Sequence, residues 1–330
     1  MGLPRLLRRK DPGTEAMTPI YENTVRLLLR IAPTVFKSGK FALKGGTAIN
    51  LFIREMPRLS VDLDLVFVDY TLSRAEAFEE ITAAINAMAA DLKRQRFECV
   101  VRGTGEVDAK IFIRGDEGIL VKVEINHVMR GTITPTVNAS ITQAVQDKFR
   151  MNVTLPMLSH EEVYASKLVA ALDRQHPRDL FDVHQLIMNE GISDETIKIF
   201  VAYLAGHNRP VHEVIFGNII DIEDEYIRNF VGMTVEEVPL QVLLDTRTEL
   251  VRGVHGRLTQ DQKDFLVSLT RAEPQWDLID IPHLQDMPAI RWKLQNLNKL
   301  KASNEVKFNA QIKELEDGLA NIWPAATATP

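Results

Sequence analysis

The stretch Lys44-Gly45-Gly46-Thr47-Ala48 is followed a little further along the chain by Ser60-Val61-Asp62-Leu63-Asp64-Leu65. The two glycines stand between a short apolar run and a segment of helical character, which predicts a strand-to-helix turn whose backbone can approach a phosphate. Asp62 and Asp64 are separated by one residue in an apolar segment, so a strand would project both carboxylates from one face. A glycine turn beside paired carboxylates is what nucleotidyl transfer requires.

The two aspartates predict a metal site. Bare carboxylates at this spacing repel each other and raise one pKa, and a divalent cation removes that conflict. Mg²⁺ favours a few carboxylates completed by water and phosphate oxygens, so Asp62 and Asp64 are predicted to bind Mg²⁺, with Mn²⁺ as the alternative ion. Glu124, on the polar face of a later strand, would supply the third carboxylate of a two-metal site. The competing interpretations are solvated acids on an exposed strand and a Glu124 paired with Lys122.

Residues around this pair are candidates for nucleotide binding. The amides of Gly45 and Gly46 face the phosphates in this interpretation, and Thr47 adds a hydroxyl. Arg58 is predicted to hold phosphate oxygens in a bidentate fork. Ser60 shares the face of the aspartates by the period of two, although a cap or turn role would explain it equally well.

A second group of candidates follows in a helical region. Lys167 is predicted to be a catalytic cation, and it shares a helix face with Arg174, seven residues later. Arg178 and Asp179 are predicted to bind nucleotide, and Asp182 to be catalytic. In the alternative interpretation, Lys167 is solvated and Asp179 only complements a helix dipole.

Composition excludes several classes of protein. The chain has 330 residues, a net charge of −6 and a single cysteine, Cys99, which excludes an intrachain disulfide and a thiolate metal site. The histidines show no zinc-hydrolase spacing, and no P-loop or Rossmann motif is present. No apolar run reaches the roughly 18 residues that span a bilayer. These features predict a cytoplasmic protein that does not act at a membrane.

The order of elements predicts an α+β fold, with a mixed region of strands and helices followed by helices alone. Residues 1–17 form a basic leader, residues 18–145 an α+β domain and residues 146–330 a helical domain in this prediction. Strands are expected near 41–44, 61–68, 97–102, 108–114 and 119–128. Helices are expected near 19–32, 47–54, 73–92, 159–174, 178–189, 194–206, 234–253, 259–271, 287–301 and 304–322. Glu162 is expected to complete a capping box with Ser159.

These motifs resemble those of the AbiEii-type nucleotidyltransferase toxins of type IV toxin–antitoxin and phage-defence (abortive infection) systems, within the DNA-polymerase-β-like superfamily. Its first motif matches Gly45, Gly46, Thr47, Arg58, Ser60, Asp62 and Asp64. Glu124 matches the acid of the second motif, although Asn126 stands where the family prefers an arginine. Lys167 matches the third motif, and Arg178, Asp179 and Asp182 match the fourth loosely. The resemblance covers about residues 20–320.

The resemblance implies a polymerase-β-like nucleotidyltransferase domain followed by a helical bundle. It also implies transfer of a nucleoside monophosphate from an NTP to the 3′ acceptor end of tRNA, which blocks translation, and a cognate antitoxin encoded next door. In this interpretation Glu124 or Asp182 orients or deprotonates the acceptor hydroxyl. Modification of a protein hydroxyl and a non-catalytic nucleotide-binding module are the alternatives. The acceptor RNA would need a basic groove, for which the last helices offer Arg291, Lys293, Lys299, Lys301 and Lys307.

Overall fold

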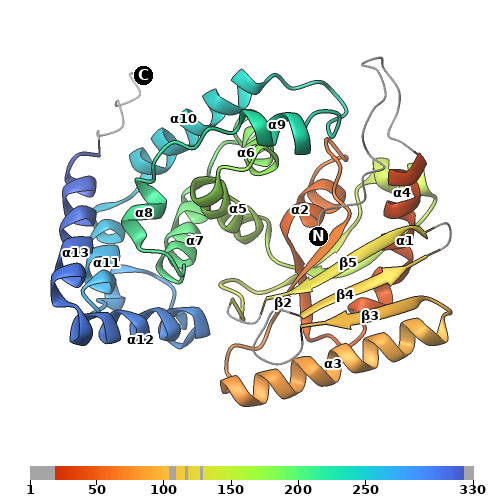
Figure 1. The fold of residues 1–330 in the computed structure, drawn as a ribbon, viewed down its shortest axis with the longest axis horizontal. Coiled ribbons are helices and arrows are strands. Elements are labelled where there is room, and N and C mark those ends of the chain that lie inside the picture. Colours follow the sequence, from red (N-terminus) through yellow and green to blue (C-terminus); the bar gives the residue numbers. More distant parts are fainter. Residues whose placement is uncertain (1–18, 104–108, 116–117, 127–128, 323–330) are drawn as a thin grey trace.

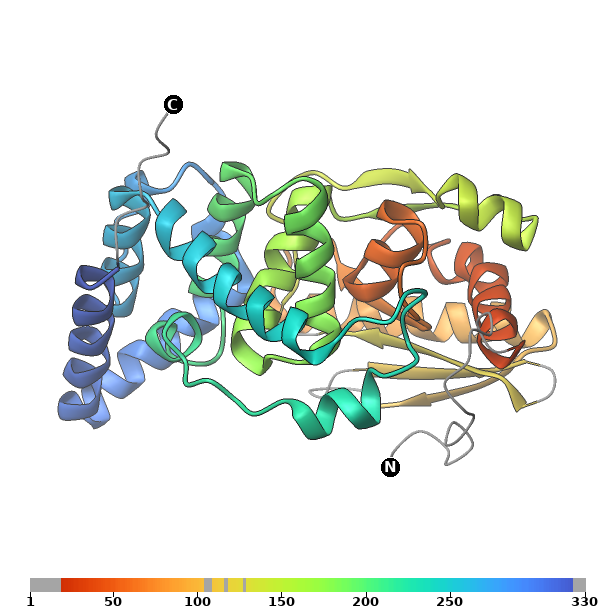
Figure 2. The same ribbon diagram turned by 90° about the horizontal axis from the view of Figure 1, so that it is seen from above.

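The computed structural model describes residues 19–103, 109–115, 118–126 and 129–322. The predicted leader at 1–17 lies outside these ranges. A sheet with its covering helices occupies one end of the molecule, and helices fill the other end (Figure 1). Seen from above, α5, α6 and α10 lie between the sheet and the C-terminal helices (Figure 2).

Seven strands form one mixed sheet. Its spatial order is β3-β4-β5-β2-β1-β7-β6. The central strand β2 is antiparallel to β1 and parallel to β5, while β1 is parallel to β7. The bounds are β1 (Phe41–Lys44), β2 (Asp62–Phe67), β3 (Glu98–Arg102), β4 (Ala109–Arg114), β5 (Leu120–Ile125), β6 (Val137–Ser140) and β7 (Thr154–Met157).

Helices surround the sheet and then continue without strands. The first group is α1 (Pro19–Val35), α2 (Gly45–Thr47) continued by the π-helical turn η2 (Ala48–Ile53), α3 (Arg74–Arg94) and α4 (Gln143–Phe149). The second is α5 (His160–Arg174), α6 (Pro177–Asn189), α7 (Asp194–Ala205), α8 (Val211–Ile215), α9 (Glu223–Asn229), α10 (Leu240–Arg257), α11 (Gln260–Thr270), α12 (Pro288–Ser303) and α13 (Glu305–Ala320), with 3₁₀ turns η4 (Trp276–Leu278) and η5 (Leu284–Asp286). Among the described residues, no helix combines the length and apolar character needed to cross a membrane.

The two faces of the sheet differ in chemistry. Helices α1 and α3 pack on one face, where Leu63, Leu65 and Val123 are fully buried. The alternation predicted within 119–128 is confirmed at 121–126, because Val121 and Ile125 are also buried while Lys122, Glu124 and Asn126 are half-buried; residues 127 and 128 lie outside the described ranges. The opposite face therefore carries the polar residues of β2 and β5, and it is turned toward the helical region.

Some elements differ from the sequence prediction. Strands β6 and β7 were missed, and β7 joins the sheet beside β1 through Leu43 and Met157. The sheet thus continues beyond residue 145, where the helical domain was predicted to begin. The helix predicted for 234–253 starts only at Leu240. Helices α8 and α9 were also missed.

Glu162 fixes the chain between the sheet and α5. Ser159 caps α5 by accepting from Glu162 N, but the predicted reciprocal half of a capping box is absent from this described helix start. The buried Glu162 carboxylate instead accepts from the backbone of Ile133 and Thr134, at 2.8 and 2.9 Å, and from Tyr203 Oη at 2.9 Å. Four such donors, with Thr134 Oγ1 included, satisfy a buried carboxylate.

Candidate active site

The two aspartates lie side by side on the polar face of the sheet. Asp62 and Asp64 are on β2, and the register places Asp64 between Lys44 of β1 and Glu124 of β5. Asp62 lies opposite Lys122. Because directly opposed residues project from the same face, three carboxylates and two lysines meet there. The sequence prediction that Asp62, Asp64 and Glu124 lie close together is confirmed.

Asp64 lies among charges of both signs. Burial raises the pKa of its carboxyl, Asp62 and Glu124 raise it further, and Lys44 and Lys167 oppose the rise. A carboxylate held beside two others has an unfavourable ionised form, which a cation would relieve. The pair Asp62 and Asp64 therefore fits the few carboxylates that Mg²⁺ takes from a protein.

Glu124 has other partners in this arrangement. Its Oε1 lies 2.8 Å from Lys110 Nζ and 3.3 Å from Lys122 Nζ, and Lys122 also reaches Asp62 Oδ2 at 3.2 Å. Burial acts to raise the pKa of Glu124, but the two lysines outweigh it and the pKa lies below its usual value. Within the described residues, no three Asp, Glu, His or Cys side chains converge to hold a metal. Glu124 thus lies beside the aspartates without being arranged as a third ligand.

The raised pKa of Asp64 makes a prediction about stability. Ionising the Asp64 carboxyl is less favourable in the folded protein than in the unfolded chain. The free energy of unfolding therefore falls as the pH rises from the ordinary pKa of an aspartate to the raised pKa of Asp64 in the folded protein. Below that window both states bind the proton and the penalty is absent. We expect Asp64→Asn to melt at a higher temperature than the wild type at about pH 7, with a gap that narrows toward about pH 4. Differential scanning fluorimetry with a chelator present measures it, and a gap that widens toward acid would contradict the assignment.

The glycine turn packs closely against Asp64, Arg58 and Ser60. Gly45 has φ +76°, and a Cβ there would lie 2.3 Å from Asp64 Oδ2. At Gly46 a Cβ would lie 2.8 Å from Arg58 Nη2 and 2.9 Å from Ser60 Oγ. Since real Cβ atoms do not approach so closely, both positions require glycine. The predicted strand-to-helix turn is confirmed, and its backbone lies against the carboxylate pair.

Polar side chains beneath the turn hold it in place. The buried Thr47 hydroxyl donates to Asp62 O and lies 3.0 Å from Ser60 Oγ. Asn50 Nδ2 donates to Gly46 O at 2.9 Å. The hydroxyl that the sequence assigned to a phosphate is therefore occupied inside the protein, where it joins the turn to β2.

A buried ion network links the turn to the helical region. Arg58 donates through Nε and Nη2 to both oxygens of Asp182, at 2.7 and 2.6 Å. Lys167 Nζ lies 2.7 Å from Asp179 Oδ1 and 3.1 Å from Asp182 Oδ2. Arg174 also pairs with Asp179. The guanidinium of Arg58, which was predicted to bind phosphate, therefore binds the carboxylate of Asp182. Asp179 does not only complement the helix dipole, because it forms buried ion pairs with Lys167 and Arg174.

The acids of this network are held ionised. Burial acts to raise the pKa of Asp182, but Arg58 and Lys167 outweigh it and the pKa is lowered. Asp179 behaves in the same way with Lys167 and Arg174, and its pKa falls far below the usual value. A carboxylate with such partners is a poor proton acceptor.

Arg178 is a cation of α6 close to this network. Its half-buried guanidinium has no hydrogen bond or ion pair with another described residue. Burial and the neighbouring Arg58 lower its pKa, while Asp179 and Asp62 oppose the shift, so it lies within electrostatic reach of the acids. An unpaired, partly desolvated arginine beside a carboxylate pair is suited to a phosphate chain.

Comparison with known proteins identifies the family of this chain. The family model described as the nucleotidyl transferase AbiEii toxin of type IV toxin–antitoxin systems matches residues 26–296. The chain belongs to the AbiEii family. Among solved structures it resembles MenT4, a nucleotidyltransferase toxin of Mycobacterium tuberculosis, with 17% identity and a TM-score of 0.57 over 84% of this chain and 94% of that one. Comparison with curated proteins gives no match.

The family assignment confirms the resemblance drawn from the motifs, and the AbiEii proteins are nucleotidyltransferases. The α+β class, a mixed sheet followed by helices, is confirmed as well. The predicted basic groove is wrong at Lys293, which is buried and donates to His207 O and Arg209 O at 2.9 and 2.6 Å. Arg291 and Lys301 pair with acids of their own.

Two residues of this AbiEii site, Lys44 and Tyr21, were assigned no role from the sequence. Lys44 stands opposite Asp64. Lys122 stands opposite Asp62, and the predicted alternative that it pairs with Glu124 is confirmed at 3.3 Å. The Tyr21 hydroxyl accepts a hydrogen bond from Ser60 N at 3.0 Å, just before the start of β2. No local pattern marks Tyr21, because its partner is far along the chain.

Proposed function

We propose that this AbiEii protein transfers a nucleoside monophosphate from an NTP to the 3′ acceptor end of tRNA in a reaction that requires Mg²⁺. The observation that carries the proposal is the carboxylate pair Asp62 and Asp64 beside the glycine turn, with Arg178 of α6 within electrostatic reach of Asp62. The proposal divides the work between two regions. The sheet supplies the acids, and α5 and α6 supply cations.

The reaction joins the acceptor to the α-phosphate. The 3′ oxygen of the RNA forms a bond to the α-phosphorus, the bond to the oxygen that bridges to the β-phosphate breaks, and pyrophosphate leaves. Bound Mg²⁺ supplies Lewis-acid stabilisation of phosphate charge, and Asp62 and Asp64 would hold it. The amides of Gly45 and Gly46 and the guanidinium of Arg178 bind the phosphate chain. These fixed groups act by positioning and charge stabilisation.

Other predicted residues act through their neighbours. Asp182 is ionised, buried and bonded to Arg58 and Lys167, so we assign it a positioning role in place of proton transfer. Lys167 lies in the same buried network and opposes the rise in the pKa of Asp64, which supports a role for its charge beside the reacting phosphate. Glu124, opposite Asp64, is the group that orients the acceptor hydroxyl in this proposal.

Two macromolecular partners belong to the proposal. The acceptor is a tRNA acceptor stem, and the type IV toxin–antitoxin family supports a cognate antitoxin that opposes the enzyme.

The reaction is tested by incubating the protein with each α-labelled NTP, Mg²⁺ and total tRNA. We expect label to enter RNA with one or more NTPs, only when a divalent cation is present. Label on a protein band would favour modification of a protein hydroxyl. Nucleotide binding without release of pyrophosphate under any condition would favour a non-catalytic module. Either result would overturn the proposal.

Arg178 provides a test of the nucleotide site. We expect Arg178→Ala to raise the KM for NTP by about 10- to 100-fold, because a charge-assisted contact to phosphate contributes about 1.5–3 kcal/mol. Stability should hardly change, since the side chain pairs with no described residue. Arg228→Ala is the matched control, because Arg228 is exposed and pairs only with Asp224 among the described residues. An unchanged KM for NTP in Arg178→Ala would remove this residue from the site.

A further inference from the structure

The face of the sheet that carries the aspartates continues outward to the edge strand. Strands β2, β5, β4 and β3 lie side by side in this order, with β3 at the edge. Because directly opposed residues project from the same face, two rows of side chains cross it. These rows are Asp62, Lys122, Phe112 and Val100, and Asp64, Glu124, Lys110 and Arg102. The carboxylate pair and the outward side of β4 and β3 therefore form one surface.

This surface is exposed on its two outer strands. Helices α1 and α3 pack on the other face of the sheet, where Ile111 of β4 is fully buried. On the surface itself, Val100 is 44% exposed, and Arg102 and Lys110 are exposed as well. The side chain of Phe112 is half-buried between β3 and β5. An aromatic ring and two cations are thus presented to solvent beside the site.

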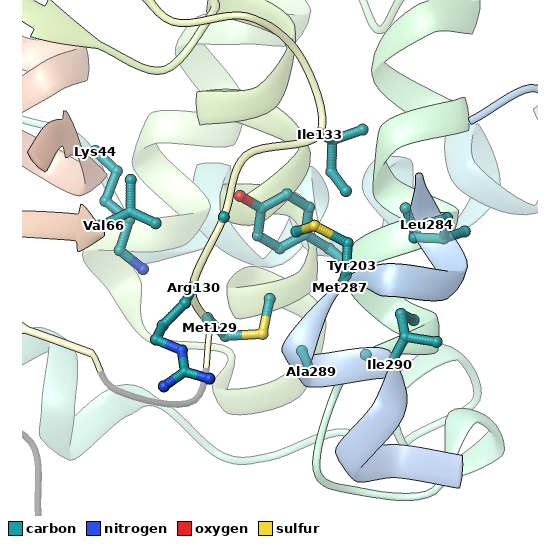
Figure 3. A pocket seen from close by; sticks show the side chains of 13 residues that line it. Lys44, Val66, Met129, Arg130, Ile133, Tyr203, Leu284, Met287, Ala289 and Ile290 are labelled. Atoms are coloured by element: carbon teal, nitrogen blue, oxygen red, sulfur yellow. The ribbon is translucent and has the colours of Figure 1, made fainter. Parts of the chain in front are cut away.

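Toward the helical region, the same face is closed. The cavity between the sheet and the helices has a volume of about 20 Å³, which is room for about one water molecule. Lys44 and Val66 line it from the sheet, and Tyr203 and Ile290 line it from the helices (Figure 3). A nucleobase does not fit there, whereas the opposite direction, from β5 to β3, ends in solvent.

Phe112 and Arg102 have the chemistry that a single-stranded nucleic acid needs. The central guanidinium carbon of Arg102 lies 5.4 Å from the centroid of the Phe112 ring. Arg102 forms no hydrogen bond or ion pair with another described residue, so its charge is available to a ligand. Unpaired bases stack on aromatic rings and on arginine guanidinium planes, and arginine also contacts the phosphates.

The charge of these strands also favours a polyanion, although the whole chain is acidic. The polar face of β3 and β4 carries one acid, Glu98, against three cations, which are Arg102, Lys110 and Arg114. Glu98 lies 3.6 Å from Arg114, and both side chains are more than half exposed. Water screens such exposed pairs strongly, so phosphates can compete for the arginine.

We infer that the exposed face of β3 and β4 binds the single-stranded 3′ end of the acceptor RNA. The inference rests on the proposed function, in which Glu124 of β5 orients the attacking hydroxyl. Strand β4 lies about 5 Å further out and β3 about 10 Å. The nucleotides that precede the reacting one would therefore cross Phe112 and Arg102.

The first test measures binding with and without the single strand. The probe is a fluorescein-labelled RNA hairpin that ends in the tRNA 3′ sequence, compared with the same hairpin without this overhang. We expect the wild type to bind the overhang probe about 10-fold more tightly, which is 1.4 kcal/mol. Phe112→Leu should lose this preference because leucine offers no ring for stacking, and Phe112→Trp should retain it. A preference that survives in Phe112→Leu would overturn the inference.

The second test uses salt to detect the phosphate contact. One phosphate contact on a single strand contributes about 0.7 to the slope of log K against log salt concentration. We expect Arg102→Met to reduce the slope by about this amount. Arg252→Met is the control, because Arg252 is exposed on α10 and pairs with no residue in the described part of the chain. An unchanged slope in Arg102→Met would contradict the inference.

Steady-state kinetics distinguishes this inference from the proposed function. We expect Phe112→Leu to raise the KM for tRNA about 10-fold and to leave the KM for NTP unchanged. A raised KM for NTP alone would assign the surface to the nucleotide, and dissociation of a dimer without loss of RNA affinity would assign it to a second copy of the chain. Either result would overturn the inference and leave the proposed function standing. Overhang-dependent binding without any transfer of label to RNA would instead refute the proposed function and support the surface as an RNA site.

Discussion

Asp62→Asn loses at least about 10³-fold in kcat while the protein remains folded, because removing a metal-binding carboxylate forfeits several kcal/mol of transition-state stabilisation. The fold is expected to survive because the Asp62 side chain is 41% exposed and, among the described residues, forms an ion pair with Lys122 alone. Exposed pairs of this kind contribute about 0–1 kcal/mol to stability. The measurement is initial-rate transfer of α-labelled NMP, with melting temperature and circular dichroism recorded on the same preparation.

A matched control distinguishes the loss of a metal-binding carboxylate from the loss of one negative charge elsewhere on the protein. Glu79→Ala removes one carboxylate from the exposed surface of α3, away from the polar face of the sheet, and should retain wild-type turnover. Titration with Mg²⁺ adds a second readout, because the wild type should gain thermal stability with the ion and Asp62→Asn should gain less. A folded Asp62→Asn protein with near-wild-type turnover would remove Asp62 from the metal site.

The central part of the fold could be predicted because its patterns are local. Alternation in β2 and β5 placed the aspartates and Glu124 on one face, and Ser73 and Glu76 form the capping box that begins α3. Strand β7 could not be recognised in the same way. It has four residues, contains Pro156 and pairs with β1 more than a hundred residues earlier, so its formation depends on tertiary contacts.

The parts of the site that depend on local patterns could also be predicted from the sequence. The proximity of Gly45, Asp62 and Asp64 could be predicted, since a turn and a strand are both local patterns. The roles of Arg58 and Asp182 could not be, because their ion pair joins residues 124 positions apart. An arginine before a metal site and an acid on a helix each suggest contact with substrate, whereas the structure shows that they contact each other.

Removal of Asp182 is expected to have the largest effect on stability. Asp182→Ala leaves the buried Arg58 and Lys167 with one carboxylate fewer, and breaking a buried pair in this way costs about 3–5 kcal/mol. Arg58 Nη2 also lies against Gly46, so the glycine turn should lose its support. Equilibrium urea unfolding measures the loss. The control is Asp173→Ala, whose pair with Arg209 is partly exposed and should contribute about 0–1 kcal/mol.

A double variant distinguishes stability from function. Replacing a buried ion pair with apolar side chains of similar volume is often neutral or stabilising, so Arg58→Met with Asp182→Leu should recover much of the stability that Asp182→Ala loses. Activity should not recover, because a methionine cannot make the guanidinium contacts to Asp182 and Leu59 O that hold the Arg58 side chain beside Gly46. Recovery of both stability and kcat would show that the network serves folding alone. Recovery of neither would mean that Lys167, left with Asp179, cannot remain buried without a second carboxylate.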